Sequence, residues 1–213
     1  MSGREPLPRH LYYLFPYNPP LAMNPRLLAL IPTCVALNVV LGRIVAELGL
    51  PIFLDTVGTV TATALAGPVA GIITGLTSQG LTALTSGQMM WLAFAPIQVL
   101  IALVAGAAAR RGGFSSATSA LLWGALCGGI GGVLSAGISY GAFDGVTTTG
   151  ITALNAAMRY LGFGLATAVT ISSIFSDVLD KALTFAFAGA VLRALPIRLA
   201  SRFPLAMRSA GRE

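Results

Sequence analysis

The chain has 213 residues, of which 55% are hydrophobic and only 9% are charged, and its formal net charge is +6. Soluble domains carry about 25% charged residues, so this composition excludes an ordinary soluble protein and predicts an integral membrane protein. Most basic residues flank apolar segments, which favours an explanation by membrane topology over a nucleic-acid partner.

The sequence offers little material for catalysis. Cys34 and Cys127 lie within apolar segments and His10 is the only histidine, so we expect neither a disulfide nor a metal site. The motifs G-x-x-x-x-G-K-[ST], H-E-x-x-H and G-x-S-x-G do not occur. We therefore expect no catalytic residues, no cofactor and no ATP hydrolysis by this chain.

The N-terminal part predicts a polar, aromatic tail at residues 1–24, without the features of a signal peptide, followed by a first span at about 26–47. That length crosses roughly 30 Å of hydrocarbon. Within it, Asn38 either bonds to another helix or contacts a ligand. Arg43 and Glu47, four residues apart, are expected to pair on one helix face.

The next stretch predicts a hairpin of two short helices, at about 55–66 and 68–84, interrupted at Gly67-Pro68. Asp55 stands where the first helix should begin, where it either caps the first turn or binds a ligand. Small residues recur at every fourth position along both helices, at Gly58, Ala62 and Ala66, then at Gly67, Gly71 and Gly75. Such faces let membrane helices pack closely.

Three further spans are expected at about 92–109, 117–140 and 174–195, the first of them after a short loop at 85–91. The span at 117–140 carries a second ladder of small residues, at Gly124, Gly128, Gly132 and Ala136. The segment 151–170 is apolar, but Asn155 and Arg159 interrupt it.

The distribution of charge decides the number of crossings. With six spans and both termini in the cytoplasm, ten basic residues and two acids face inward, while three basic residues and five acids face outward. A seventh span at 151–170 would move the basic C-terminal residues outside, against the positive-inside rule. We therefore predict an all-α integral membrane protein with six transmembrane helices, both termini cytoplasmic, and an extra outer-side helix or re-entrant segment at 151–170.

The same reasoning predicts one six-helix membrane domain at 25–197, between the tail at 1–24 and a basic cytoplasmic tail at 198–213. Polar and aromatic residues from separate connections then converge on the outer side, as in a small-molecule pocket. The candidate substrate-binding residues are Asn38, Asp55, Gln88, Trp91, Phe94, Tyr140, Asn155, Arg159, Asp177 and Lys181.

Several of these candidates also have a simpler explanation. Lys181 is the only lysine, and Asp177 precedes it by four residues, so the two are expected to form a pair that either locks the helix or contacts a ligand. Trp91 is either a pocket wall or an interfacial anchor. The acids Glu47 and Asp144 fit a surface position best.

Two segments carry a resemblance to a known family. The segment FLDTVGT at 53–59, followed by Gly67-Pro68, resembles the substrate-binding S-components of energy-coupling factor (ECF) vitamin transporters. The segment SDVLDK at 176–181, with a helix end at LPIR (195–198), is similar to the same family. The resemblance covers about residues 26–200 and is closest to the riboflavin-type branch.

This resemblance implies a plasma-membrane protein that captures a vitamin or related micronutrient from the outer side, with riboflavin as the first ligand to try. A separate transmembrane coupling subunit and two ATPase subunits would then drive uptake. Family members contact the coupling subunit through an alanine-spaced face of the first helix. The nearest equivalents here are Ala29 with Thr33 and Pro32 with Ala36.

Two other functions remain open from the residues. A self-sufficient secondary transporter of a small organic solute would show internal repeats and an ionisable residue near the bilayer midplane, and the sequence displays neither pattern. A structural or assembly subunit of a membrane complex would not need polar and aromatic residues converging from several outer loops.

Overall fold

The structure is a computed structural model, and it describes residues 25–144, 150–203 and 205–212. The predicted tail at 1–24 therefore lies outside the described residues. Within the described part, the regular structure is entirely helical, which confirms the all-α class. The elements in chain order are α2 (Pro25–Glu47), α3 (Val57–Ala66), α4 (Pro68–Ser86), η1 (Met89–Phe94), α5 (Ala95–Arg110), α6 (Ala117–Phe143), α7 (Gly150–Tyr160), α8 (Leu165–Ala194), α9 (Ile197–Ala200) and α10 (Ala206–Ser209).

Three helical stretches are long and apolar enough to cross a membrane, at Leu28–Glu47, Met89–Arg110 and Ala117–Phe143. Large apolar side chains on the outside of the bundle agree with this, since Leu122 is 66% exposed and Val133 is 60% exposed. Polar side chains such as Gln98 and Asp180 are buried inside instead. Because lipid, unlike water, solvates apolar surface, this distribution indicates a multi-pass membrane protein.

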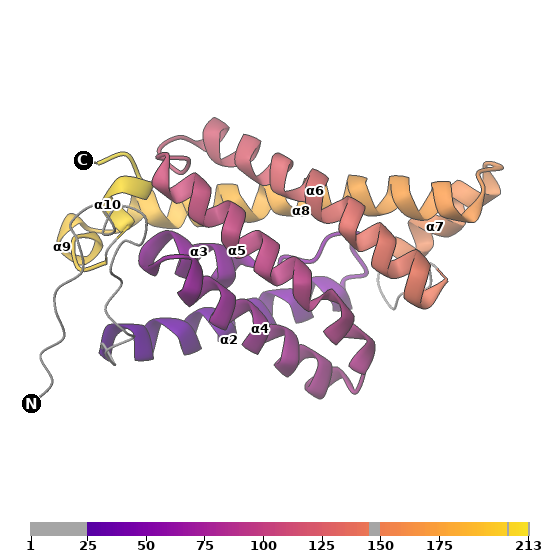
Figure 1. Ribbon diagram of the computed structural model, residues 1–213, viewed down its shortest axis with the longest axis horizontal. Coiled ribbons are helices and arrows are strands. Elements are labelled where there is room, and N and C mark those ends of the chain that lie inside the picture. Colours follow the sequence, from indigo (N-terminus) through magenta and orange to yellow (C-terminus); the bar gives the residue numbers. More distant parts are fainter. Residues whose placement is uncertain (1–24, 145–149, 204, 213) are drawn as a thin grey trace, which may run out of the picture.

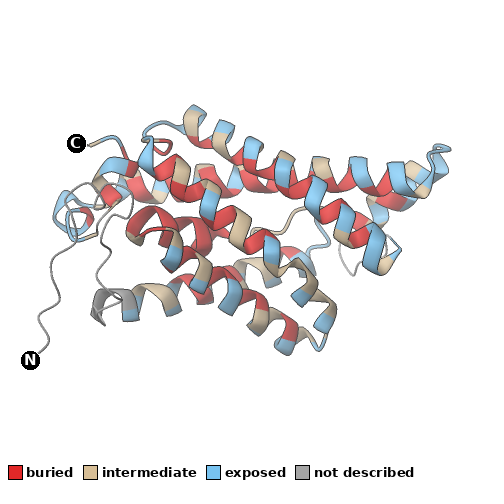
Figure 2. Ribbon diagram, viewed as in Figure 1, coloured by how far each residue is buried: buried red, intermediate tan, exposed pale blue. Residues whose placement is uncertain are grey.

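The helices form an elongated bundle (Figure 1). The two longest, α6 and α8, lie side by side along its length, and α2 to α5 pack together beneath them. The short helices α9 and α10 lie at one end, and α7 lies at the other. Helix α3 is at the centre, with every residue from Val57 to Leu65 buried (Figure 2).

Small residues produce the close contacts, as the four-residue spacing predicts. On α6, a side chain at Gly124, Gly128 or Gly132 would overlap the backbone of α8. On α3, a side chain at Gly58 would overlap the carbonyl of Cys34 on α2. Both ladders therefore serve helix packing, because close approach supplies the van der Waals contact that associates helices in lipid.

The turn between α3 and α4 also follows its sequence. Gly67 has φ +102°, a left-handed conformation that favours glycine, and Pro68 occupies the first turn of α4, where its missing N–H costs nothing. The pyrrolidine ring of Pro68 packs where a side chain at Gly106 of α5 would lie. The turn therefore confirms the predicted hairpin of α3 and α4, and α5 packs against it at Pro68.

The start of the hairpin differs from the prediction. Helix α3 begins at Val57, and the side chain of its N-cap residue, Thr56, makes no capping hydrogen bond. The Asn38 side chain of α2 accepts from the Gly58 amide of the first turn instead (2.6 Å). Asp55 is thus not the cap, because its carboxylate faces Lys181 on α8, 4.0 Å away. Residues 51–56 lead into α3 as irregular backbone.

The chain after α6 differs as well. The segment 151–170 is not one helix: α7 ends at Tyr160, Gly162 turns the chain with φ +93°, and α8 starts at Leu165 rather than near 174. Ser172 and Ser173, which precede the predicted start, are buried within α8. Residues 145–149 of the preceding loop lie outside the described residues.

The C-terminal residues 198–212 were predicted to form a tail, but they fold back onto the bundle. The Leu205 amide donates to the Leu65 carbonyl at the end of α3 (3.2 Å), and Ala206 and Ser209 are buried. Arg212 donates to the Leu195 carbonyl (2.8 Å), so it satisfies an unpaired group at the end of α8.

Candidate ligand site

The irregular segment before α3 is held in place by side chains of α8. The Asp180 carboxylate accepts hydrogen bonds through Oδ1 from the amides of Phe53 (2.9 Å) and Leu54 (2.7 Å), and the Ser176 hydroxyl donates to the Pro51 carbonyl. Non-helical backbone at membrane depth needs such partners, because lipid cannot supply them. Two segments about 126 residues apart in the chain thus form one unit.

A charged cluster lies at the centre of this unit. The Lys181 ammonium donates to Oδ2 of Asp180 and lies 4.0 Å from Oδ1 of Asp55. Lys181 is 3% exposed and Asp180 is fully buried. The Lys181 nitrogen also lies 5.8 Å from the ring centroid of Phe53, within cation–π range.

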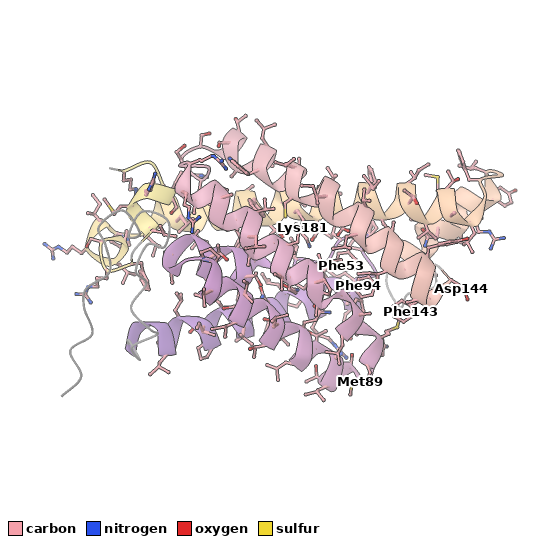
Figure 3. The ribbon with its side chains drawn as sticks, in the orientation of Figure 1. Phe53, Met89, Phe94, Phe143, Asp144 and Lys181 are labelled. Atoms are coloured by element: carbon pink, nitrogen blue, oxygen red, sulfur yellow. The ribbon has the colours of Figure 1, made fainter. Side chains whose placement is uncertain are left out.

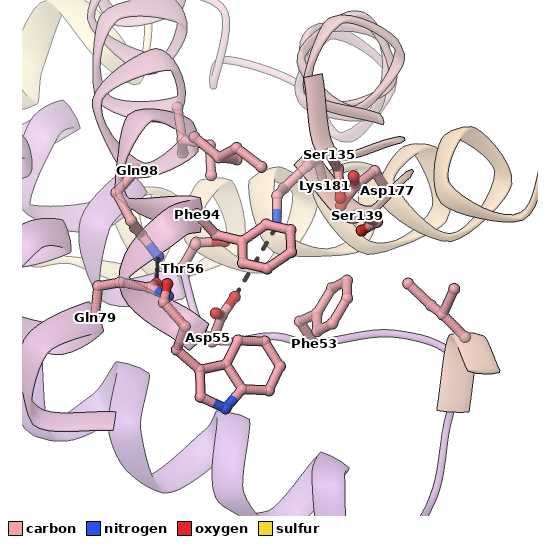
Figure 4. A pocket seen from close by; sticks show the side chains of 14 residues that line it. Phe53, Asp55, Thr56, Gln79, Phe94, Gln98, Ser135, Ser139, Asp177 and Lys181 are labelled. Atoms are coloured by element: carbon pink, nitrogen blue, oxygen red, sulfur yellow. Dashed lines mark hydrogen bonds and ion pairs between the residues drawn. The ribbon is translucent and has the colours of Figure 1, made fainter. Parts of the chain in front are cut away.

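A cavity opens beside the cluster, between the segment that leads into α3 and the helices α4, η1, α5, α6, α7 and α8 (Figure 4). The space between the lining atoms is about 510 Å³ when open solvent at the mouth is counted, of which about 50 Å³ is free for the centre of a water molecule. Charged, polar, aromatic and aliphatic side chains line it: Phe53, Asp55, Thr56, Gln79, Trp91, Phe94, Ile97, Gln98, Ile101, Ser135, Ser139, Ile151, Asp177 and Lys181. An apolar cavity with a few converging polar groups is typical of a small-molecule site.

Aromatic rings form one wall of this cavity. The Trp91 and Phe94 ring centroids lie 6.0 Å apart in a tilted arrangement, and Phe143 of α6 stacks on Phe94 at 6.1 Å. Figure 3 shows Phe53 and Phe94 near Lys181 and places Phe143 toward the end of α6. Flat rings of this kind suit a planar ligand.

A network of hydrogen bonds between polar side chains positions two of the residues that line the cavity, Gln79 and Gln98. Gln98 donates to the side chain of Gln79 (3.1 Å), Thr59 donates to Gln98 (3.2 Å), and Asn38 donates to Thr59 (2.9 Å). Asn38 also donates to Ser78 (3.0 Å) and accepts from the Gly58 amide (2.6 Å). The network therefore links α2, α3, α4 and α5, so it fixes where Gln79 and Gln98 enter the cavity.

Two polar atoms in the cavity wall have no hydrogen-bond partner among the described residues. They are Oδ2 of Asp177 and the hydroxyl of Thr56, and both residues are at least nine-tenths buried. Buried polar groups in native proteins are nearly always paired. Unpaired ones that line a cavity are therefore available to a ligand.

Comparison with protein-family models, with curated proteins and with solved structures found no match. The geometry of the chain itself therefore carries the assignment of the site.

Half of the predicted site residues meet in the cavity: Asp55, Trp91, Phe94, Asp177 and Lys181 all line it. Asn38 does not, because the hydrogen bonds of the network occupy its amide. Gln88 lines a wider adjoining groove and accepts a hydrogen bond from the indole N–H of Trp91 (3.2 Å).

The other three candidates lie apart from the cavity lining. Tyr140 is 49% exposed on α6, Arg159 is exposed near the end of α7, and Asn155 is buried on α7 without lining the cavity. The sequence-based prediction grouped these three residues with the others because the six-span topology puts all of them on one side of the membrane. Helix α7 instead brings Ile151 to the cavity.

The predicted pair of Asp177 and Lys181 is also wrong. The ion-pair partners of Lys181 are Asp180 and Asp55, whereas Asp177 lies in hydrogen-bonding range of Ser135 on α6. Residues four apart on a helix can form an ion pair. Here, however, residues 53–55 approach from across the bundle, so Asp55 becomes a partner of Lys181. The expected pair of Arg43 and Glu47 does form, at 3.0 Å, beside the adjoining groove.

Sequence reasoning missed several lining residues, among them Phe53, Thr56, Gln79, Gln98, Ser135 and Ser139. Gln79 and Gln98 were detectable, since an amide side chain inside an apolar helix usually faces the bundle interior. Phe53 had no detectable signal, because its position depends on the path of an irregular segment.

Proposed function

We propose that this chain is the substrate-binding S-component of an ECF-type vitamin importer. One observation carries the proposal: the two segments on which the resemblance rests close the same cavity. Asp55 of the first segment and Lys181 of the second lie 4.0 Å apart in its wall, and Asp180 binds the backbone of residues 53–54. A shared role in forming one ligand pocket would explain why both segments resemble the family.

The proposed topology has six spans, with both termini in the cytoplasm. Helices α2, α4, α5, α6 and α8 provide five crossings, and the sixth combines residues 51–56 with α3. Helix α3 has ten residues and is only about 15 Å long, so it cannot span lipid alone. Its burial makes the crossing tolerable, because irregular backbone inside a bundle is shielded from lipid.

In this topology the cavity opens to the outer side, where the ligand would enter. The adjoining groove, of about 1560 Å³ including open space, shares Phe53, Asp55 and Trp91 with the cavity and offers a route to it. The aromatic wall would contact a planar vitamin, with riboflavin as the first candidate, and the polar groups would orient it.

Energy for uptake would come from partner chains, a transmembrane coupling subunit and two ATPase subunits, because this chain has no phosphate-binding loop. The first helix offers a place for the coupling subunit to dock: Ala29, Pro32, Thr33 and Ala36 are all exposed on α2. Small side chains there would allow a partner helix to approach closely.

The test separates binding from transport. The purified chain alone should bind a vitamin, detected by native mass spectrometry of the isolated protein and by titration calorimetry with a vitamin panel that includes riboflavin. Reconstituted alone in liposomes, it should not accumulate that vitamin. Accumulation should require the coupling subunit, the two ATPases and ATP.

The alternative is a self-sufficient secondary transporter, and one observation favours it. Asp177, Asp180 and Lys181 are buried ionisable groups within a membrane helix, as in proton-coupled carriers. Uptake by the chain alone, driven by a proton or sodium gradient, would support that function and exclude the S-component.

A further inference from the structure

The cavity holds more negative than positive groups. Three carboxylates, those of Asp55, Asp177 and Asp180, line or border it, and Lys181 is the only cation among the lining residues that the structure describes. Lys181 is already engaged by two of these carboxylates, Asp180 and Asp55. Arg43, in the adjoining groove, is paired with Glu47 at 3.0 Å. Asp177, by contrast, forms no ion pair with any described residue.

The surroundings of Asp177 make this more than an acidic cluster. Asp177 is 3% exposed, it lines the cavity, and its Oδ2 has no hydrogen-bond partner among the described residues. Figure 4 shows it beside Ser135 and Ser139, across from the aromatic side of the cavity. A buried carboxylate without a partner is costly, and a bound cation or strong donor removes that cost.

An anionic ligand fits the same cavity poorly. The cation that would receive it, Lys181, is surrounded by Asp180 and Asp55, so a third anion would compete with both. It would also approach the uncompensated charge of Asp177. A cation gains from both features, and the rings of Trp91 and Phe94 add a favourable face for it.

We propose that the ligand of this site is a planar molecule with a positive charge, such as an amidinium, a protonated amine or a cationic aromatic ring, which Asp177 binds through Oδ2. The inference rests on the proposed ligand-binding function, and it adds the charge class of the ligand. The hydroxyl of Thr56, also unpaired and lining the cavity, supplies a second polar contact.

The test uses three probes of one shape and different charge: benzamidine as the cation, benzamide as the neutral form and benzoate as the anion. Binding to the purified full chain is measured by ligand-observed NMR titration in detergent micelles. Benzamidine should bind at least about tenfold more tightly than benzamide, because a charge-assisted hydrogen bond is roughly twice as strong as a neutral one. Benzoate should bind most weakly.

Two variants locate the effect. Asp177→Asn keeps the shape but removes the charge, so the preference for benzamidine should fall to within about threefold. Asp144→Asn is the matched control: Asp144 is an exposed carboxylate at the end of α6, in a left-handed conformation that asparagine also adopts. It should leave the preference unchanged.

Three results would overturn the inference: equal or tighter binding of benzamide or benzoate, no binding of any probe, or an unchanged preference in Asp177→Asn. These results differ from failure of the proposed function. If riboflavin or an anionic vitamin binds tightly and Asp177→Asn binds it as the parent does, the transporter proposal stands and the charge assignment falls. If the chain alone accumulates solute while the charge preference is as expected, the S-component proposal falls and the charge assignment stands.

Discussion

Asp180 makes three contacts that join α8 to the segment before α3 and to Lys181. One carboxylate oxygen accepts from the amides of Phe53 and Leu54, and the other accepts from Lys181. It thus fixes an irregular backbone segment and a buried ammonium with a single fully buried side chain. A carboxylate suits this task, because it accepts several hydrogen bonds and brings the charge that Lys181 needs.

Asp180→Ala should lower the free energy of unfolding by about 3–5 kcal/mol, because removing one partner leaves a buried charge and two amides unpaired. Asp180→Asn should cost less, since its amide oxygen can still accept from both amides. The measurement is a thermal melt in detergent, followed with a dye that reacts with the thiols of Cys34 and Cys127, both buried in the folded chain. Equal melting of both variants and the parent would contradict this role.

Trp91 and Phe94 are the aromatic candidates that line the cavity, whereas Tyr140 is 49% exposed and lies outside the lining. Trp91→Ala should weaken vitamin binding several-fold, because a lost aromatic contact costs about 0.5–1.5 kcal/mol beyond the buried area. Its backbone carbonyl would still accept from Gln79, so the fold should persist. Tyr140→Ala is the control.

Titration calorimetry of both variants with the vitamin that the parent binds provides the comparison. Loss of binding in Tyr140→Ala with unchanged binding in Trp91→Ala would place the ligand elsewhere, against the outer surface of α6. A thermal melt of each variant separates weaker binding from unfolding.

At the scale of elements, the pairing of α6 with α8 depends on glycine. A side chain at Gly128 would overlap the backbone of Asp177 and Val178, whereas the next residue, Gly129, has nothing within 4 Å of the equivalent position. The packing of α6 against α8 thus requires a glycine at position 128 but not at position 129. Because Asp177 lies on the contacted turn, this packing also positions the site.

Gly128→Ala should lower the free energy of unfolding by about 1–3 kcal/mol, the usual cost of overpacking, and should weaken ligand binding because α8 must shift. Gly129→Ala, the matched control, should be neutral or stabilising by up to about 1 kcal/mol, through helix propensity. Thermal melts of the two variants, measured beside the parent, test these expected changes in stability. A stable Gly128→Ala would mean that α6 and α8 do not pack as described.

At the scale of the whole molecule, the two ends of the bundle differ in charge. The C-terminal end of α5, which carries Arg110 and is followed by Arg111, lies near α10 and α9 at one end of the bundle, and α7 lies at the other (Figure 1). The positive-inside rule places the arginine-rich end in the cytoplasm. With that orientation, the cavity and its groove would open toward the outer side, which the proposed function requires.

Cysteine labelling in intact cells tests this orientation. Tyr160→Cys, at a position 93% exposed after α7, should react with a membrane-impermeant thiol reagent. Arg110→Cys, exposed at the end of α5, should react only after the membrane is permeabilised. The parent is a suitable background, because Cys34 and Cys127 are buried. Labelling of Arg110→Cys from outside would reverse the topology.

Local features of the sequence were enough to predict the membrane class, most helix positions, the turn at Gly67-Pro68 and the glycine ladder of α6. Each of these follows from composition or from spacing along one helix, so neighbours in the chain suffice. The boundary of α8 was missed for the same reason. Ser172 and Ser173, just before the predicted start, are buried inside the bundle, and a single segment cannot reveal this.

The partner of Lys181 was decided only by the tertiary structure. Spacing along α8 favoured Asp177, but residues 53–55 reach Lys181 from across the bundle, where Asp180 holds their backbone and Asp55 faces the ammonium. Those contacts link positions about 126 residues apart, and no periodicity encodes them. The same arrangement leaves Oδ2 of Asp177 in the cavity wall without a hydrogen-bond partner among the described residues. Asp177 was a candidate from the sequence, but this environment could not be read from its spacing along α8.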